Sequence, residues 1–173
     1  MAEIRSTLDI IMEKAKELTV TDQDKRDFAE KEVQGRVKGF FQKTLDGILK
    51  TRQLKTEMAS FDEEQRPVAE KELLAACLAA MRVEGDNQPL FEMLDQVLGC
   101  RIEPVLDLMG KFQEQQNEAR AKRTSARIQA LKGQGVSGSA VRPNLAADST
   151  WLAYLSDMED RFRNRLKTLD LTQ

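Results

Sequence analysis

The sequence predicts an all-α protein, an irregular helical bundle of about five to six helices. Apolar residues recur at intervals of three and four through most of the chain, and no strand-like alternation of useful length interrupts them. Only 9 glycines and 4 prolines are present among 173 residues, so few positions break a helix. With 40% hydrophobic and 32% charged residues, the composition is that of a chain that folds.

The first predicted helix spans residues 3–18. Its apolar residues fall on one face at helical spacing: Ile4, Leu8, Ile11, Ala15 and Leu18. Such a stripe needs an apolar partner. The β-branched residues and capping oxygens of Thr19 to Asp22 then predict a new helix start.

The second predicted helix spans residues 22–59, because no proline occurs before Pro67. At this length it would be about 57 Å long, against about 40 Å for the diameter of a compact globule of this size. We therefore expect it either to project or to bend near Thr51, where its apolar face rotates by roughly a third of a turn. Gly35 and Gly39 on this helix predict either a close helix contact or two tolerated glycines.

Two further helices are predicted between residues 62 and 99. The first begins with the acidic residues Asp62 to Glu64, has Pro67 in its first turn and is apolar on every side from Leu73 to Met81, so we expect it to be the most buried helix. The second is short, with Asn87 as its predicted N-cap, and Gly99 ends it.

The fifth predicted helix spans about residues 102–131, and its character changes along its length. Its first half is apolar, whereas its second half carries Arg120, Arg123 and Arg127 on nearly the face that Phe112 occupies earlier. The core-facing stripe therefore becomes a cationic one.

The chain is then predicted to divide into a helical bundle (1–132), a flexible, glycine-containing linker (133–147) and a C-terminal docking helix (148–173). The last helix is predicted to begin near Asp148. Its apolar face is coherent and consists of Trp151, Leu155, Met158, Phe162, Leu166 and Leu169.

The arginine row lies in the one stretch with a strong charge bias. Residues 119–147 contain no acid and carry +6, which leaves −8 on the rest of a chain whose net charge is −2. The row has three interpretations: pairing within the chain, for example with the acidic segments 22–27 or 62–64; a docking strip for an acidic protein; or binding of nucleic-acid phosphates. The last is disfavoured, because no aromatics interleave with the arginines and the rest of the protein would repel a polyanion.

No pattern in the sequence predicts catalysis, a cofactor or a metal. The chain has no histidine, which removes the most common general base and zinc ligand. Gly133, Gly135 and Gly138 have the spacing of a dinucleotide motif but follow a predicted helix instead of a strand. The acids 22–27 lack the glycine and the glutamate of a calcium loop.

The predicted location is the cytoplasm. The first residues lack the basic and apolar regions of a secretory signal, and no apolar run approaches the length of a membrane span. Cys77 and Cys100 are predicted to be unpaired thiols of a reducing compartment.

These observations predict a non-enzymatic helical protein that binds a protein partner or forms a homo-oligomer. The residues expected to bind the partner are Arg120, Arg123, Arg127, Trp151, Leu155, Met158 and Phe162. Two alternatives stay open: a nucleic-acid-binding regulator that uses the basic segment 119–132, and a carrier or sensor of a small molecule in the helical core.

Overall fold

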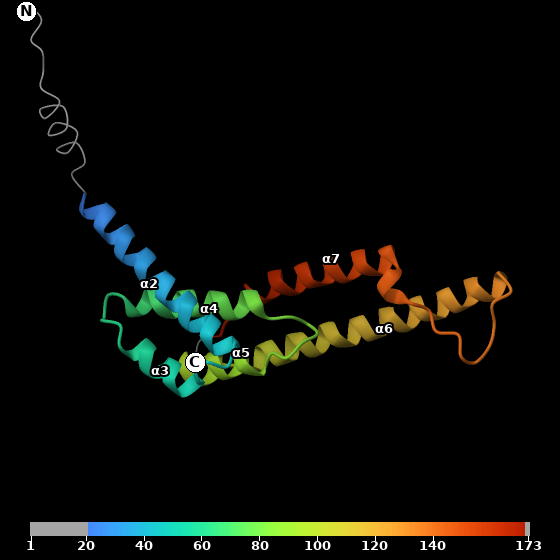
Figure 1. Cartoon of the computed structure of the whole chain (residues 1–173), viewed down its shortest axis with the longest axis horizontal. Coiled ribbons are helices and arrows are strands. Elements are labelled where there is room, and N and C mark those ends of the chain that lie inside the picture. Colours follow the sequence, from blue (N-terminus) through green and yellow to red (C-terminus); the bar gives the residue numbers. More distant parts are fainter. Residues whose placement is uncertain (1–20, 172–173) are drawn as a thin grey trace, which may run out of the picture.

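The computed structural model describes residues 21–171, and every regular element within this range is a helix (Figure 1). This confirms the predicted all-α class. The predicted helix 3–18 lies outside the described residues. The described elements are α2 (Asp22–Leu45), α3 (Thr51–Ala59), α4 (Arg66–Ala80), α5 (Gln88–Glu92), the π-helical turn η1 (Met93–Val97), α6 (Glu103–Gly133), the 3-10 turn η2 (Leu145–Ala147) and α7 (Ser149–Leu166).

Helix α2 begins with a capping box. The Thr21 hydroxyl accepts a hydrogen bond from the Asp24 amide (3.1 Å), and the Asp24 carboxylate accepts one from the Thr21 amide (2.9 Å). The second half of α2 packs across α4 through Val33 and Val37, which are buried. The start of α2 points away from the body of the protein (Figure 1). Residues 21–32 are all exposed, although Arg26, Ala29 and Glu30 line a hollow together with residues 62–68.

The predicted helix 22–59 is interrupted after Leu45 by a short turn. Gly47 adopts a φ of 72° there, a left-handed conformation that ends the helix. Helix α3 then begins at Thr51, the position at which the apolar face was predicted to rotate. The structure therefore combines the two expected outcomes. Helix α2 projects at its start, and the predicted long helix is interrupted between Leu45 and Thr51.

Helix α4 lies against α2, α3 and α7. It begins at Arg66, four residues later than predicted, because the Asp62 side chain accepts a hydrogen bond from the Gln65 amide (2.8 Å) in a preceding turn. The apolar run of this helix, which predicts the most buried helix, is not covered on every side. Ala75 and Ala79, one turn apart, are exposed to solvent.

Asn87 is the N-cap residue of α5, as predicted, but its side chain does not cap the helix. Asn87 makes no capping bond; its side-chain amide donates to the Arg82 carbonyl (2.8 Å) and accepts from the Arg82 amide (3.2 Å). The buried Asn87 side chain thus closes the turn between α4 and α5. Gly99, with a φ of 65°, follows the π-helical turn η1 that continues α5, and it ends this helical segment as predicted.

Helices α6 and α7 form the long hairpin seen in Figure 1. Residues 134–144 between them contain no helix, and α7 returns alongside α6. Met158, Phe162 and Leu166 of α7 are buried in the common core. Beyond α7, the Leu171 carbonyl accepts a hydrogen bond from the Arg101 amide (3.1 Å), which ties this end of the chain to the approach to α6. In the described range no helix combines the length and apolar character that crossing a bilayer requires.

We predict opposite stability effects for two glycine substitutions. Gly47→Ala should lower the free energy of unfolding by about 1 to 2 kcal/mol, since an alanine is strained at this left-handed φ. Gly39→Ala should raise it by up to about 1 kcal/mol, since Gly39 lies inside α2 with open space around it and alanine favours a helix. Urea unfolding followed by circular dichroism measures both. A loss of stability in Gly39→Ala would instead indicate a close helix contact at this glycine.

Candidate interaction surfaces of the C-terminal helix

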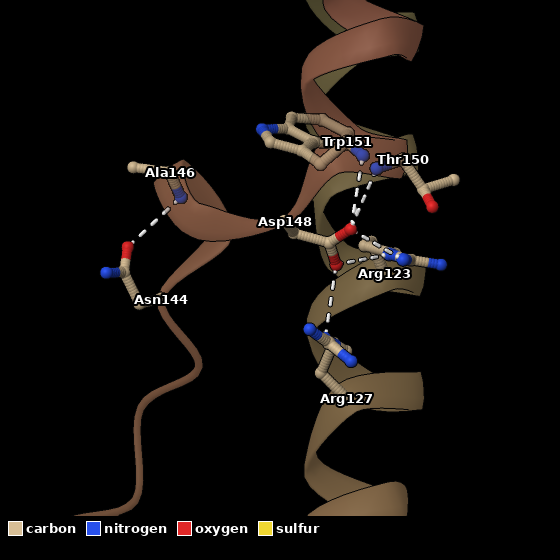
Figure 2. A network of polar contacts seen from close by, with 7 residues as sticks. All are labelled: Arg123, Arg127, Asn144, Ala146, Asp148, Thr150 and Trp151. Atoms are coloured by element: carbon tan, nitrogen blue, oxygen red, sulfur yellow. Dashed lines mark hydrogen bonds and ion pairs between the residues drawn. The ribbon is translucent and has the colours of Figure 1, made fainter.

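The start of α7 is held by one carboxylate, Asp148. This side chain caps the helix by accepting hydrogen bonds from the amides of Thr150 (3.1 Å) and Trp151 (3.3 Å). It also binds the guanidinium of Arg123 through two hydrogen bonds, of 2.8 and 2.7 Å (Figure 2). Arg127 approaches the same carboxylate at 3.1 Å. We call Asp148, Arg123 and Arg127 the clasp, because together they join α7 to α6.

The clasp is electrostatically strong because its acid is buried. The Asp148 side chain is only 3% exposed, so its charge depends on the two guanidiniums that accompany it. The hydrogen bonds from Arg123, with that of the Trp151 amide and the charges of Arg123 and Arg127, lower the pKa of Asp148 from 3.8 to about 2 in spite of its burial. The same hydrogen bonds raise the pKa of Arg123.

The third arginine of the row pairs elsewhere. Arg120 forms an ion pair of 2.8 Å with Glu84, in the turn after α4. Its guanidinium also lies 6.0 Å from the centre of the Trp151 ring, which in turn stacks on Tyr154. All three predicted arginines therefore interact within the chain. Their acids are Asp148 and Glu84 and not the segments 22–27 or 62–64.

This pairing reduces the charge that segment 119–132 presents to a polyanion. Its remaining cations are Lys122, which lies 4.0 Å from Glu118, and Lys132. A phosphate would have to compete with Asp148 for the two arginines of the clasp. The nucleic-acid alternative gains no support from this arrangement.

The apolar residues of α7 that were predicted to bind a partner also lie inside this chain. Trp151, Met158 and Phe162 are buried, and Leu155 is half-buried. The Phe162 ring meets the Phe112 ring of α6 edge-on, with 5.4 Å between their centres. A partner could contact the buried residues among these only if α7 separated from the rest of the chain.

A different surface is open to a partner, a groove between α4 and α7. Its volume is about 450 Å³, and Leu74, Ala75, Leu78 and Ala79 of α4 form its apolar floor. Its rim carries three cations: Lys71 of α4, Arg163 of α7, and Lys167, the C-cap residue that follows α7. No acid lines it, although Asp160 lies 3.8 Å from Arg163. We call this surface the basic-rimmed groove.

The sequence does contain a signal for the groove. The run from Leu73 to Met81 has no polar face, which predicts that this helix is the most buried one. The other meaning of such a run is a helix that keeps an apolar strip for a partner. The cations of α7 could not be assigned to the strip, since they lie about ninety residues further along the chain.

Residues 21–171 contain few other side chains that could bind a metal or act as a nucleophile. No group of three or more metal-binding side chains occurs among residues 21–171. Burial, with a smaller contribution from Cys100, raises the pKa of the Cys77 thiol to about 12, so this cysteine is protonated at neutral pH and is a poor nucleophile. Burial also raises the pKa of Cys100, which is more accessible.

We predict that Asp148→Asn destabilises the protein at pH 7 more than an ordinary surface substitution does. The pKa of Asp148 is depressed in the folded state, so the clasp contributes stability above about pH 4 and loses it as the pH falls through about 2. The difference between wild type and variant should therefore shrink as the solution is acidified. Urea unfolding, followed by the fluorescence of Trp151 beside the clasp, measures it.

The matched control is Asp157→Asn, which removes an exposed acid of α7 that pairs with Arg161. Equal effects of the two substitutions at pH 7 would contradict the clasp.

We also predict that the two thiols react at different rates. In the folded protein at pH 8, a disulfide reagent such as dithiodipyridine should modify Cys100 first, and Cys77 only when urea exposes it, since Cys77 is buried and protonated. Rates measured on Cys77→Ala and Cys100→Ala assign the two phases. Fast reaction of the folded Cys100→Ala chain would show that Cys77 is accessible.

Comparison of the chain with protein-family models, with curated proteins and with solved structures finds no match. The functional argument therefore depends on the surfaces described above.

Proposed function

We propose that this protein is a non-enzymatic protein-protein interaction module, and that its basic-rimmed groove receives a helix of a protein partner. The observation that carries the proposal is the groove itself, an apolar floor on α4 bordered by cations of α4 and α7. A soluble helix normally turns such a floor toward its own core. The unpaired cysteines support the further proposal that the protein acts in the reducing environment of the cytoplasm.

The floor has the shape that a helix needs. Ala75 and Ala79 lie one turn apart on the exposed face of α4, and their small side chains allow the backbone of another helix to approach closely. Leu74 and Leu78 are half-buried beside them and supply apolar surface. An amphipathic helix laid in this groove would bury its apolar face against these four residues, which is a common mode of peptide recognition.

The rim selects the charge of the partner. Lys71, Arg163 and Lys167 favour a helix whose apolar face is bordered by Asp or Glu. Each exposed ion pair contributes only a few tenths of a kcal/mol, so the rim speeds and orients binding while the floor supplies most of the affinity. A basic partner would be repelled at this site.

The probe that tests this function is a fluorescein-labelled helical peptide of about 20 residues, roughly 30 Å long, with leucines at helical spacing bordered by glutamates. Its fluorescence anisotropy should rise on titration with the protein. Ala79→Trp, which fills the groove, should weaken binding about tenfold or more, a change of about 1.4 kcal/mol.

The control variant is Ala130→Trp, which places the same side chain at an exposed position near the far end of α6. It should bind the peptide as wild type does. A peptide with lysines in place of the glutamates should bind less tightly than the acidic one. Equal binding to wild type and Ala79→Trp would refute the proposed site.

A further inference from the structure

A glutamine occupies a core-facing position of α6. Gln116 lies one helical turn after Phe112, on the side of α6 that meets α7, and it is only 3% exposed. Its side-chain amide forms no hydrogen bond with any residue of the described chain. A buried polar group without a hydrogen bond lowers stability, so native chains rarely keep one unless another molecule completes it.

A second polar atom without a partner lies on α7. The carboxylate of Glu159 accepts a hydrogen bond from the Val83 amide through Oε1 (3.3 Å), which holds it against the turn between α4 and α5. Its other oxygen, Oε2, is buried, and no donor within residues 21–171 reaches it. Gln116 and Glu159 line the same pocket, so both unmet hydrogen-bonding groups belong to one site.

This pocket lies between α6, α7 and the turn between α4 and α5, and we call it the polar pocket. Its volume is about 250 Å³, and the charged side chains that line it are Arg82, Glu84 and Glu159. Glu84 is already neutralised by Arg120, at 2.8 Å. Arg82 and Glu159 form no ion pair within the described residues. The polar pocket therefore offers a ligand one free positive and one free negative charge.

The walls of the polar pocket are held in place by contacts within the chain. The Asn87 side chain bonds both the amide and the carbonyl of Arg82, which fixes the turn between α4 and α5. The ion pair between Glu84 and Arg120 ties this turn to α6. Because these contacts form without a ligand, a small molecule would bind with little reorganisation of the protein.

We infer that the polar pocket binds a free amino acid, with its ammonium group on Glu159 and Gln116 and its carboxylate on Arg82. An ammonium carries three N–H donors, so it can donate to Oε2 of Glu159 and to Oε1 of Gln116. The Arg82 guanidinium then donates to the carboxylate. The side chain of the amino acid lies against Leu155 and Met158, the apolar residues of the pocket.

A zwitterion fits this site better than a ligand with a single charge. A simple amine would pair with Glu159 but leave Arg82 beside it without a counterion, and a simple acid would meet the carboxylate of Glu159. The polar pocket shares no lining residue with the basic-rimmed groove. The amino acid is therefore a ligand in addition to the proposed helical partner, and either proposal can fail without the other.

The test is nuclear magnetic resonance of the ¹⁵N-labelled full chain, titrated with each standard amino acid in turn to about 10 mM, a range that covers the weak binding of a ligand with few atoms. At least one amino acid should shift the side-chain amide signals of Gln116 until they saturate. Their loss in Gln116→Leu assigns these signals. Propylamine, which has no carboxylate, and propionate, which has no ammonium, should each bind about tenfold more weakly or less.

A matched pair of variants tests the carboxylate. Glu159→Gln removes the charge but keeps the size of the side chain, and it should weaken amino-acid binding about tenfold or more. Asp160→Asn is the control, because Asp160 is the next acid along α7 but is exposed and does not line the polar pocket. It should bind the amino acid as wild type does.

Gln116→Leu separates a ligand site from a structural role. Leucine has a similar size and needs no hydrogen bond, so this variant should unfold at the same or a higher urea concentration than wild type while it loses the ligand. The amino acid at saturation should raise the urea midpoint of wild type and leave that of Gln116→Leu unchanged.

Four results would overturn the inference. They are the absence of any shift of the Gln116 signals with every amino acid, equal affinity for propylamine and the tightest-binding amino acid, equal binding by Glu159→Gln and Asp160→Asn, and full binding by Gln116→Leu.

Discussion

The buried carboxylate of Asp148 is the constraint on which the arrangement of the C-terminal half depends. A charge that is 3% exposed is tolerated only with close counterions, and Arg123 and Arg127 of α6 provide them. The same carboxylate also caps α7, so its contact with the arginines of α6 fixes where α7 begins. From that point α7 runs back along α6 and reaches α4, where its later residues form one wall of the groove.

This constraint changes the role of α7. The sequence presents an amphipathic helix after a linker, which predicts a docking element for another protein. In the structure its apolar face is used within the chain, as the contact between Phe162 and Phe112 shows. The surface left for a partner combines the outer, charged side of α7 with the exposed alanines of α4. Neither helix has this surface alone, so interaction at the groove requires α7 to be docked first.

The features that the sequence predicted correctly depend on residues close together in the chain. The features that it missed depend on contacts between residues far apart in the chain. Local signals placed α6, the start of α7 near Asp148 and the end of the π-helical turn at Gly99 correctly. The interruption after Leu45 was expected only as a bend, since a left-handed φ at Gly47 is one of several conformations open to glycine. The partners of the arginine row were missed because Arg120 and Glu84 are 36 residues apart, and Asp148 was considered only as a helix start. The groove joins residues still further apart, which periodicity within one helix cannot reveal.

Whether α7 docks on its own chain is the claim that all of these proposals share, and an isotope-filtered nuclear Overhauser measurement tests it most directly. In a uniformly labelled sample, the rings of Phe112 and Phe162, 5.4 Å apart, should give strong cross-peaks. In a mixture of labelled and unlabelled chains, a filter that selects contacts between chains should remove these cross-peaks. If they persist under the filter, α7 is exchanged between subunits, and the groove described here is not formed by a single chain.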